Sequence, residues 1–187
     1  MTYEFSKFVS STRINLITDE DATKSGIQNA FENWLIPRES ADSTVLVYIA
    51  GHGTPMYFAP FDSVLYTNEN NLSSQELGYW LERLDSQNIV LLMDFCNSYD
   101  YSLDINIDDI DIMTCGSMGQ ICWESEEYQG GIYSLALREA IKKPAEIDID
   151  NDNIISTKEL FAFMDQYMHV LFESNPPPAP QNPRIID

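Results

Sequence analysis

The sequence predicts an α/β fold in which a largely parallel sheet lies between two layers of helices. Two continuous apolar runs, at residues 43–50 (STVLVYIA) and 88–95 (NIVLLMDF), have the pattern of strands buried on both faces. Segments with helical periodicity alternate with these runs, as is typical of α/β sheets. At 187 residues, 44% of them hydrophobic, the chain is long enough for one domain with its own core.

The individual elements follow in chain order from periodicity and end signals. Residues 13–18 (RINLIT) predict a short strand, and residues 22–36 predict a helix that is capped by the acidic residues 19–21 and ends before Pro37. The capping signal LSSQE at residues 72–76 predicts a second helix that runs through residue 84. A third strand is expected within residues 108–115, and two more helices are expected at residues 131–142 and 157–172.

The chain divides into a domain and a tail. We expect residues 1–172 to form a single domain, because no linker interrupts them. Residues 173–187 form a Pro-rich C-terminal tail, with five prolines between residues 175 and 183. We expect this tail to be extended and unpacked.

The charge of the chain argues against some partners and favours others. There are 30 acidic and 10 basic side chains, which give a formal net charge of −20. Such a chain repels phosphate backbones and anionic lipids, so we expect neither nucleic acid nor a membrane as a partner. It would attract basic polypeptide or divalent cations, although acidity that only maintains solubility is the alternative interpretation.

The three cysteines predict a reducing compartment. Their odd number and sparse placement do not fit a disulfide framework, and their spacing does not fit a zinc site. We therefore expect a cytoplasmic protein. The N-terminal residues lack an apolar core of signal-peptide length, and no apolar run approaches the roughly 20 residues of a membrane helix.

Two loops leave the two buried strands with reactive side chains. His52 lies between two glycines after the first strand, and Cys96 follows the second strand among polar residues. Active residues of parallel sheets gather at the carboxyl ends of strands, where a Cys/His pair can act as nucleophile and general base. The alternatives are a structural histidine and a small buried thiol, and burial is what we expect of Cys115 and Cys122.

The two loop sequences, YIAGHG and MDFCNS, together resemble the paired signature of caspase-like (clan CD) cysteine peptidases. Metacaspases and bacterial caspase-like peptidase C14 domains have the most similar form of it, and the resemblance extends over most of residues 19–166. It implies a caspase-like αβα sandwich and a cysteine endopeptidase with a Cys-His dyad. In such an enzyme His52 is the general base, Cys96 is the nucleophile, and the backbone N–H groups of Gly53 and Cys96 form the oxyanion hole.

The resemblance also implies a substrate groove that binds polypeptide. Asp94 matches the acid at the base of the first specificity pocket, where it would pair with a substrate Arg or Lys. An aspartate that caps the strand end is the structural alternative. This chemistry requires no cofactor, and the rest of the groove would be lined by Cys115, Gly116, Ser117 and Trp123.

Two departures from the family pattern bear on activity. Tyr99 stands where the family has glycine, so the loop after the nucleophile must differ. The family's first strand and helix normally precede the segment that begins this chain, so the usual first strand is expected to be missing. Residues 1–13 could replace it, or an upstream segment or a partner chain could supply it. The alternative to a peptidase is a catalytically silent caspase-like module that binds partners or calcium.

A second constellation near the C-terminus has the spacing of an EF-hand calcium loop. Oxygen ligands fall at the first, third, fifth, ninth and twelfth positions, and Asn153 stands where glycine is usual. An acidic loop followed by a helix cap, without metal, is the alternative. The candidate calcium ligands are Asp148, Asp150, Asp152, Ile154, Ser156 and Glu159.

Overall fold

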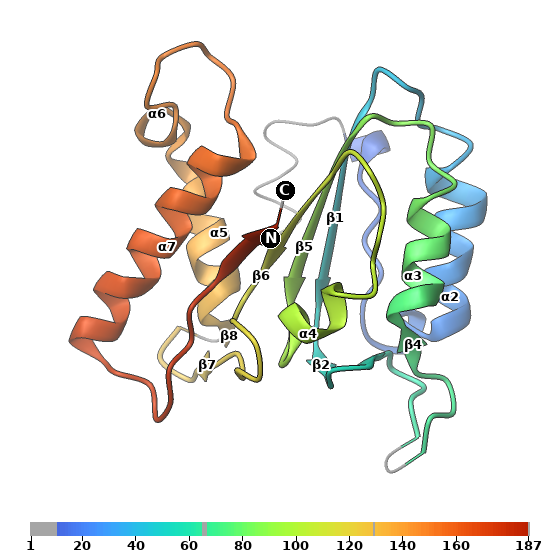
Figure 1. The fold of residues 1–187 in the computed structure, drawn as a ribbon, viewed down its shortest axis with the longest axis horizontal. Coiled ribbons are helices and arrows are strands. Elements are labelled where there is room, and N and C mark those ends of the chain that lie inside the picture. The colour runs from blue at the N-terminus through green and yellow to red at the C-terminus, as the bar shows by residue number, and fades with distance from the viewer. Residues whose placement is uncertain (1–10, 65–66, 129, 187) are drawn as a thin grey trace.

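The computed structural model describes residues 11–64, 67–128 and 130–186 (Figure 1). Its central sheet has the strand order β1-β5-β6-β9. The strands β1 (Thr44–Ala50), β5 (Asn88–Asp94) and β6 (Ile110–Thr114) run parallel, and β9 (Arg184–Ile186) pairs antiparallel with β6. The predicted α/β fold with a mostly parallel sheet is therefore confirmed.

Helices cover both faces of this sheet (Figure 1). On one side lie α2 (Lys24–Asn29) and α3 (Ser74–Leu81), and on the other lie α5 (Ile132–Lys142) and α7 (Thr157–Ser174). Two apolar clusters fill the space between the layers. The shorter elements are η1 (Ser11–Arg13), η2 (Asp19–Asp21), the π-helical η3 (Ala30–Leu35), β2 (His52–Gly53), β3 (Tyr57–Ala59), β4 (Leu72–Ser73), α4 (Ser98–Ser102), β7 (Glu124–Ser125), β8 (Gly130–Gly131) and α6 (Pro144–Ile147).

The start of α3 shows how local sequence determines an element. The Ser73 side chain accepts a hydrogen bond from the Glu76 backbone N–H, and the Glu76 carboxylate accepts one from the Ser73 backbone N–H. This reciprocal capping box satisfies two donors that a helix start otherwise leaves unpaired. The inward face is buried, as the periodicity predicts, with the side chains of Leu77, Trp80, Leu81 and Leu84.

The N-terminal predictions are partly wrong. Residues 14–18 form no strand, and none of the described strands pairs with them. The following helix begins at Lys24, because Thr23 caps it by accepting a hydrogen bond from the Gly26 N–H, and the acidic residues 19–21 form a separate 3₁₀ turn. Most of the segment that could replace the family's first strand, residues 1–10, lies outside the described residues.

The C-terminal tail is packed, which contradicts the expectation of an unpacked tail. Its last described residues form β9, where Thr114 faces Arg184 and Ile112 faces Ile186 in the β6–β9 register. Before the strand, Gln181 is only 3% exposed. The reason is that β6 would otherwise present an unpaired edge, which β9 covers. The division at residues 172 and 173 stays a prediction.

The lengths and compositions of the helices are relevant to a membrane as a partner. Among the described residues, none forms a helix with the combined length and apolar character needed to cross a bilayer.

Candidate active site

The two predicted reactive loops lie side by side at the carboxyl ends of β1 and β5. Ala50 faces Asp94 in the parallel register, and the Gly51 N–H donates to the Asp94 carbonyl at 3.2 Å. His52 and Cys96 each follow two residues after this aligned pair. The sheet register therefore delivers both loops to one edge, where Figure 1 shows β2 beside α4.

Gly53 lies directly against the nucleophile loop. The Cβ of a side chain there would overlap the edge of the Phe95 ring and lie 3.0 Å from the Cys96 carbonyl oxygen. Only glycine allows the backbones to approach this closely. The close approach places the Gly53 backbone beside Cys96, as an oxyanion-hole donor requires.

The two dyad residues differ in exposure. His52 is exposed, whereas Cys96 is a half-buried free thiol whose Sγ lies 4.0 Å from the Cys122 carbonyl oxygen. In the described part of the chain, no hydrogen bond joins the His52 imidazole to the Cys96 thiol. Catalytic hydrogen bonds of substrate-free enzymes are often long and tighten only when substrate binds. The dyad therefore stays a prediction.

Asn97 turns the chain away immediately after Cys96. Its φ of 61° is left-handed, a conformation that asparagine tolerates better than most residues. Its backbone N–H donates to the Gln120 carbonyl at 2.9 Å. The short helix α4 then contains Tyr99, the residue at which the family has glycine. Tyr99, which stands where the family has glycine, therefore lies in a short helix that follows the nucleophile.

Asp94, the last residue of β5 and two residues before Cys96, has a buried side chain in a polar environment. Its side chain lies under the start of α5, where Oδ2 accepts hydrogen bonds from the Tyr48 hydroxyl at 3.2 Å and from the Ser134 backbone N–H at 3.1 Å, and contacts the Ser134 hydroxyl. Burial raises the pKa of Asp94, the hydrogen bonds from Ser134 and Tyr48 lower it, and the charge of Glu124 raises it further. The net effect is a raised pKa.

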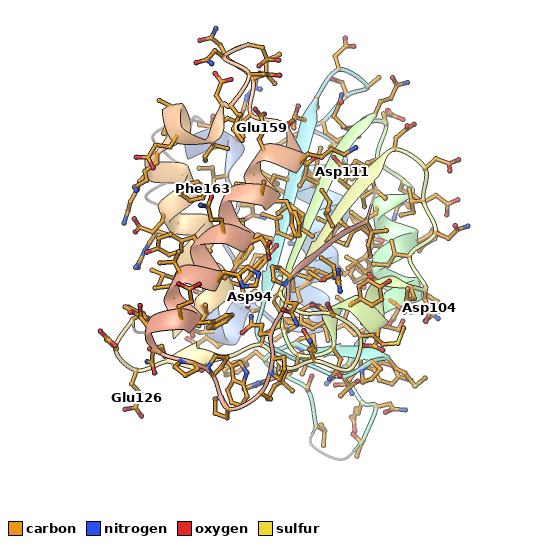
Figure 2. All side chains as sticks on the ribbon, turned by 60° about the vertical axis from the view of Figure 1, so that its left-hand side comes forward. Asp94, Asp104, Asp111, Glu126, Glu159 and Phe163 are labelled. Atoms are coloured by element: carbon orange, nitrogen blue, oxygen red, sulfur yellow. A yellow bond between two sulfur atoms is a disulfide. The ribbon has the colours of Figure 1, made fainter. Side chains whose placement is uncertain are left out.

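The Gly131 backbone packs closely against the Asp94 carboxylate. An added Cβ at this position would lie 2.8 Å from Asp94 Oδ2 and 3.4 Å from Oδ1. All three contacts of the carboxylate with Ser134 and Tyr48 involve Oδ2. Within the described structure, Oδ1 is therefore left without a hydrogen-bond donor. Figure 2 shows Asp94 in the interior of the molecule.

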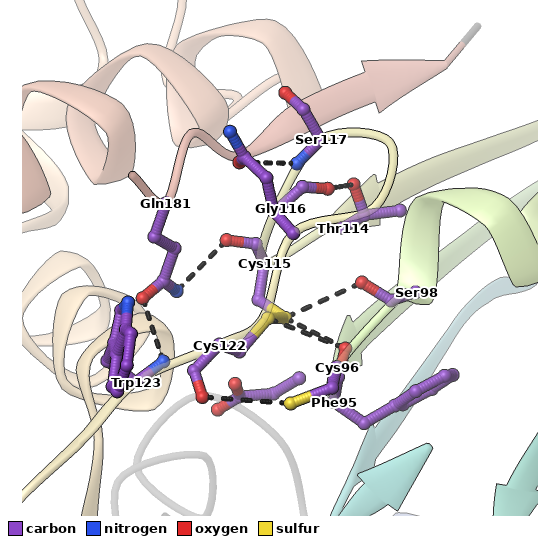
Figure 3. The surroundings of a disulfide bond; sticks show 12 residues. Phe95, Cys96, Ser98, Thr114, Cys115, Gly116, Ser117, Cys122, Trp123 and Gln181 are labelled. Atoms are coloured by element: carbon purple, nitrogen blue, oxygen red, sulfur yellow. Dashed lines mark hydrogen bonds between the residues drawn. A yellow bond between two sulfur atoms is a disulfide. The ribbon is translucent and has the colours of Figure 1, made fainter. Parts of the chain in front are cut away.

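Cys115 and Cys122 form a disulfide, which contradicts the expectation of unpaired cysteines (Figure 3). Their Cα atoms are 5.9 Å apart, a separation that a disulfide spans. The Phe95 carbonyl oxygen lies 3.2 Å from Cys115 Sγ and 3.4 Å from Cys122 Sγ, so the disulfide adjoins the residue before the nucleophile. The cysteine argument for a reducing compartment no longer holds, and the cytoplasmic location stays a prediction.

The predicted groove residues lie on one loop, residues 115–123, but they do not all face Cys96. Ser117 is turned toward the tail, where its hydroxyl donates to the Asn182 carbonyl at 3.0 Å. The Gly116 carbonyl accepts from the Thr114 hydroxyl at 2.9 Å. The Trp123 indole donates to the Ala179 carbonyl at 2.9 Å.

Comparison with known proteins identifies the family. A family model described as the caspase domain (peptidase C14) matches residues 2–185. The chain belongs to this family. Among solved structures, caspase-1 from Spodoptera frugiperda matches with a TM-score of 0.60 and 18% sequence identity, over 100% of this chain and 76% of that one. No curated protein matches.

Membership of the caspase-domain family indicates cysteine peptidase activity in general and polypeptide as the substrate class. The structural match confirms the caspase-like αβα fold. At 18% identity it carries the fold alone.

Three residues that contact the Asp94 carboxylate were not predicted from the sequence. Tyr48 and Ser134 donate hydrogen bonds to the Asp94 carboxylate, and the Gly131 backbone packs against it. Tyr48 could have been noticed as the one aromatic hydroxyl in a largely aliphatic strand. Ser134 and Gly131 lie about 40 residues further along the chain than Asp94, and no local pattern links them to it.

The candidate calcium loop lies between α6 and α7, at the opposite end of the molecule from β2 and β7 (Figure 1). The carboxylates of Asp148, Asp150 and Asp152 have oxygen atoms within 4.8 Å of one another. Asn153 adopts a φ of 66° and donates its backbone N–H to Asp148. The Glu159 carboxylate caps α7, accepting from the backbone N–H groups of Ser156 and Ile149 at 2.9 Å each.

Proposed function

We propose that this caspase domain is a cysteine endopeptidase that cleaves polypeptides after Arg or Lys. The observation that carries the proposal is the position of Asp94. It is a buried carboxylate two residues before Cys96, and among the described residues its Oδ1 accepts no hydrogen bond. A substrate guanidinium or ammonium group in this pocket would bring the adjoining peptide bond to the nucleophile.

Cys96 would act as a thiolate after His52 accepts the thiol proton. Attack of Sγ on the scissile carbonyl carbon gives a tetrahedral oxyanion, which the backbone N–H groups of Gly53 and Cys96 would stabilise. The C–N bond breaks as protonated His52 returns the proton to the departing amine. Water, deprotonated by His52, then hydrolyses the thioester and releases the carboxylate product and Cys96.

The charge of the pocket supports a basic substrate residue. Burial disfavours the ionised form of Asp94. A positively charged substrate side chain next to the carboxylate would stabilise that form. A substrate aspartate would instead place a second carboxylate beside Asp94 and near Glu124, where like charges repel. Tyr48 and Ser134 offer donors to the carboxylate and bring no compensating positive charge.

The direct test is hydrolysis of fluorogenic peptides that end in Arg, Lys, Asp or Asn, by the wild type and by Cys96→Ala. We expect cleavage after Arg and Lys, abolished in Cys96→Ala. Cleavage after Asp or Asn would retain the dyad and overturn the pocket assignment. Silence on all four, together with no covalent labelling of Cys96 by a thiol probe, would favour the silent binding module, or a site completed by an upstream segment or a partner chain.

We also propose that residues 148–159 bind calcium. The clustered carboxylates and the left-handed Asn153 fit an oxygen-ligand loop, in which Ile154 would contribute its carbonyl and Ser156 its hydroxyl. Glu159 would have to turn from its capping bonds toward the ion. Calcium would have no part in the peptide-bond chemistry and would stabilise the start of α7.

Thermal unfolding with and without millimolar calcium tests this site. We expect calcium to raise the melting temperature of the wild type and of the exposed-surface control Asp85→Asn. It should not change that of the double variant Asp150→Asn with Asp152→Asn, because the bound ion stabilises only a fold that holds it. An equal calcium shift in all three proteins would refute the site.

A further inference from the structure

Gln181 is a buried carboxamide that bridges the two ends of the 115–123 loop (Figure 3). It is 3% exposed. Its Nε2 donates to the Cys115 carbonyl at 3.0 Å, and its Oε1 accepts from the Trp123 backbone N–H at 2.9 Å. Both partners are main-chain groups. Without the Gln181 side chain, each would give up its hydrogen bond to water on folding and gain no protein partner in its place.

The loop that Gln181 bridges surrounds the nucleophile. The Gln120 carbonyl accepts from the Asn97 N–H, and the Cys122 carbonyl lies 4.0 Å from Cys96 Sγ. Trp123 directly precedes β7, which pairs with β8 beside the Asp94 pocket. A shift of this loop would therefore alter both the surroundings of the thiol and the wall of the pocket.

The tail is built to hold Gln181 in place. Pro180 and Pro183 flank the segment and restrict its backbone, and β9 anchors it to β6 one residue after Pro183. Asn182 adds a second attachment, because its N–H donates to Gln120 Oε1 at 2.8 Å, and the same oxygen accepts from the Ser117 N–H. Little conformational freedom is left for the carboxamide to lose.

We propose that Gln181 is a positioning residue of the peptidase: its carboxamide fixes the 115–123 loop and, through it, the space around Cys96 and Asp94. The effect on catalysis rests on the proposed function. The effect on the order of the 115–123 loop rests on the hydrogen bonds alone. The C-terminal tail then acts as a wall of the site, although it lies about 85 residues after the nucleophile in sequence.

Hydrogen exchange separates these two consequences. Gln181→Met removes both hydrogen bonds at similar volume, and Gln166→Met makes the same change on the exposed side of α7. We expect the amides of residues 116–123 to exchange about tenfold faster in Gln181→Met, an effect within the range expected for two lost hydrogen bonds, and at the wild-type rate in Gln166→Met. Unchanged exchange in Gln181→Met would overturn the proposal.

Peptide hydrolysis by the same variants tests the catalytic consequence. We expect kcat/KM on the Arg peptide to fall about tenfold or more in Gln181→Met, by way of both kcat and KM, with Gln166→Met unchanged. Faster loop exchange with normal kinetics would show that Gln181 orders the loop without positioning the site, and would overturn the positioning role. If the wild type has no activity, the proposed function is refuted. Hydrogen exchange alone then tests whether Gln181 orders the 115–123 loop.

Gln181→Glu supplies a second variant if the Met variant fails to fold. The introduced carboxylate, when ionised, keeps the acceptor for the Trp123 N–H but faces the Cys115 carbonyl without a donor. Protonation restores an O–H donor, so we expect loop exchange, relative to the wild type at each pH, to return toward normal as the pH falls through the pKa of the introduced carboxyl group. The same relative exchange at every pH would contradict the bridging role.

Discussion

Two walls of the site are held in different ways. The wall formed by the β1 and β5 loops, with His52, Gly53 and Cys96, is fixed by the register of paired strands. The opposite wall, the 115–123 loop, is fixed by the Cys115–Cys122 disulfide and by side chains of the C-terminal tail. A wall held by the sheet tolerates little change, whereas one held by a few side chains can be loosened one contact at a time.

The sheet-held wall should be the more sensitive of the two. In Gly53→Ala the new Cβ would overlap the Phe95 ring and press on the Cys96 carbonyl. We expect the loop to shift and the oxyanion-hole N–H to move out of line, with a loss of about 10²–10³ in kcat. Steady-state kinetics on the Arg peptide measures this loss.

Gly78→Ala is the matched control for that variant. Gly78 lies inside α3, and an added Cβ meets nothing within 4 Å. Alanine there should stabilise the fold by about 0.5–1 kcal/mol and leave kcat unchanged. Equal activity of the two alanine variants would show that the close approach at Gly53 has no catalytic role.

Asp94, the base of the proposed specificity pocket, should control specificity. Asp94→Asn keeps the shape and removes the charge, so we expect KM for the Arg peptide to rise about 100-fold while kcat changes little. Because the pKa of Asp94 is raised, KM of the wild type should fall as the pH rises through that pKa. KM of the variant should lack this pH dependence, and a matching pH profile in both proteins would assign the titration to another group.

The same raised pKa has a consequence for stability. An acid whose pKa is higher in the fold than in the unfolded chain favours folding most when protonated, so its contribution is complete below the unfolded pKa and is lost as the pH rises through the folded pKa. Urea unfolding from pH 4 upward should therefore show a fall in the stability of the wild type relative to Asp94→Asn. A constant difference between the two would contradict the shift.

The packing against the Asp94 carboxylate can be changed without removing its charge. In Gly131→Ala the Cβ would lie 2.8 Å from Asp94 Oδ2, whereas an added Cβ at Gly130 meets nothing within 4 Å. We expect kcat/KM for Arg and Lys peptides to fall about tenfold in Gly131→Ala, from the cost of overpacking, and to stay unchanged in Gly130→Ala. Equal activities would show that the close packing of Gly131 against the carboxylate has no part in substrate binding.

The contrast between the walls also explains what the sequence could predict. The strands at residues 43–50 and 88–95 and the capping signal before α3 are local patterns, so the fold class, His52 and Cys96 followed from them. Neither the Cys115–Cys122 pairing nor the role of Gln181 has such a pattern. A seven-residue cysteine separation fits many structures, and a glutamine among prolines has no hydrophobic period that predicts its burial.

The N-terminal strand prediction was wrong for a related reason. The pattern in residues 13–18 indicates an extended segment, but a strand also needs a pairing partner. Residues 14–18 pair with none of the described strands, although β1 lies at an edge of the described sheet. Local pattern thus predicts conformation better than it predicts pairing.

Removal of the disulfide is expected to have the smallest effect on activity, because Gln181 still holds the same loop when the disulfide is absent. Closing so short a loop stabilises a fold by at most about 2.5 kcal/mol, so Cys122→Ser should lower the free energy of unfolding by about that amount. With Gln181 in place we expect kcat/KM to change less than about threefold, and in the double variant with Gln181→Met the loss should exceed the sum of the two single effects. Additive effects in this double-mutant cycle would mean that the two attachments act on the loop separately, and that neither compensates for the other.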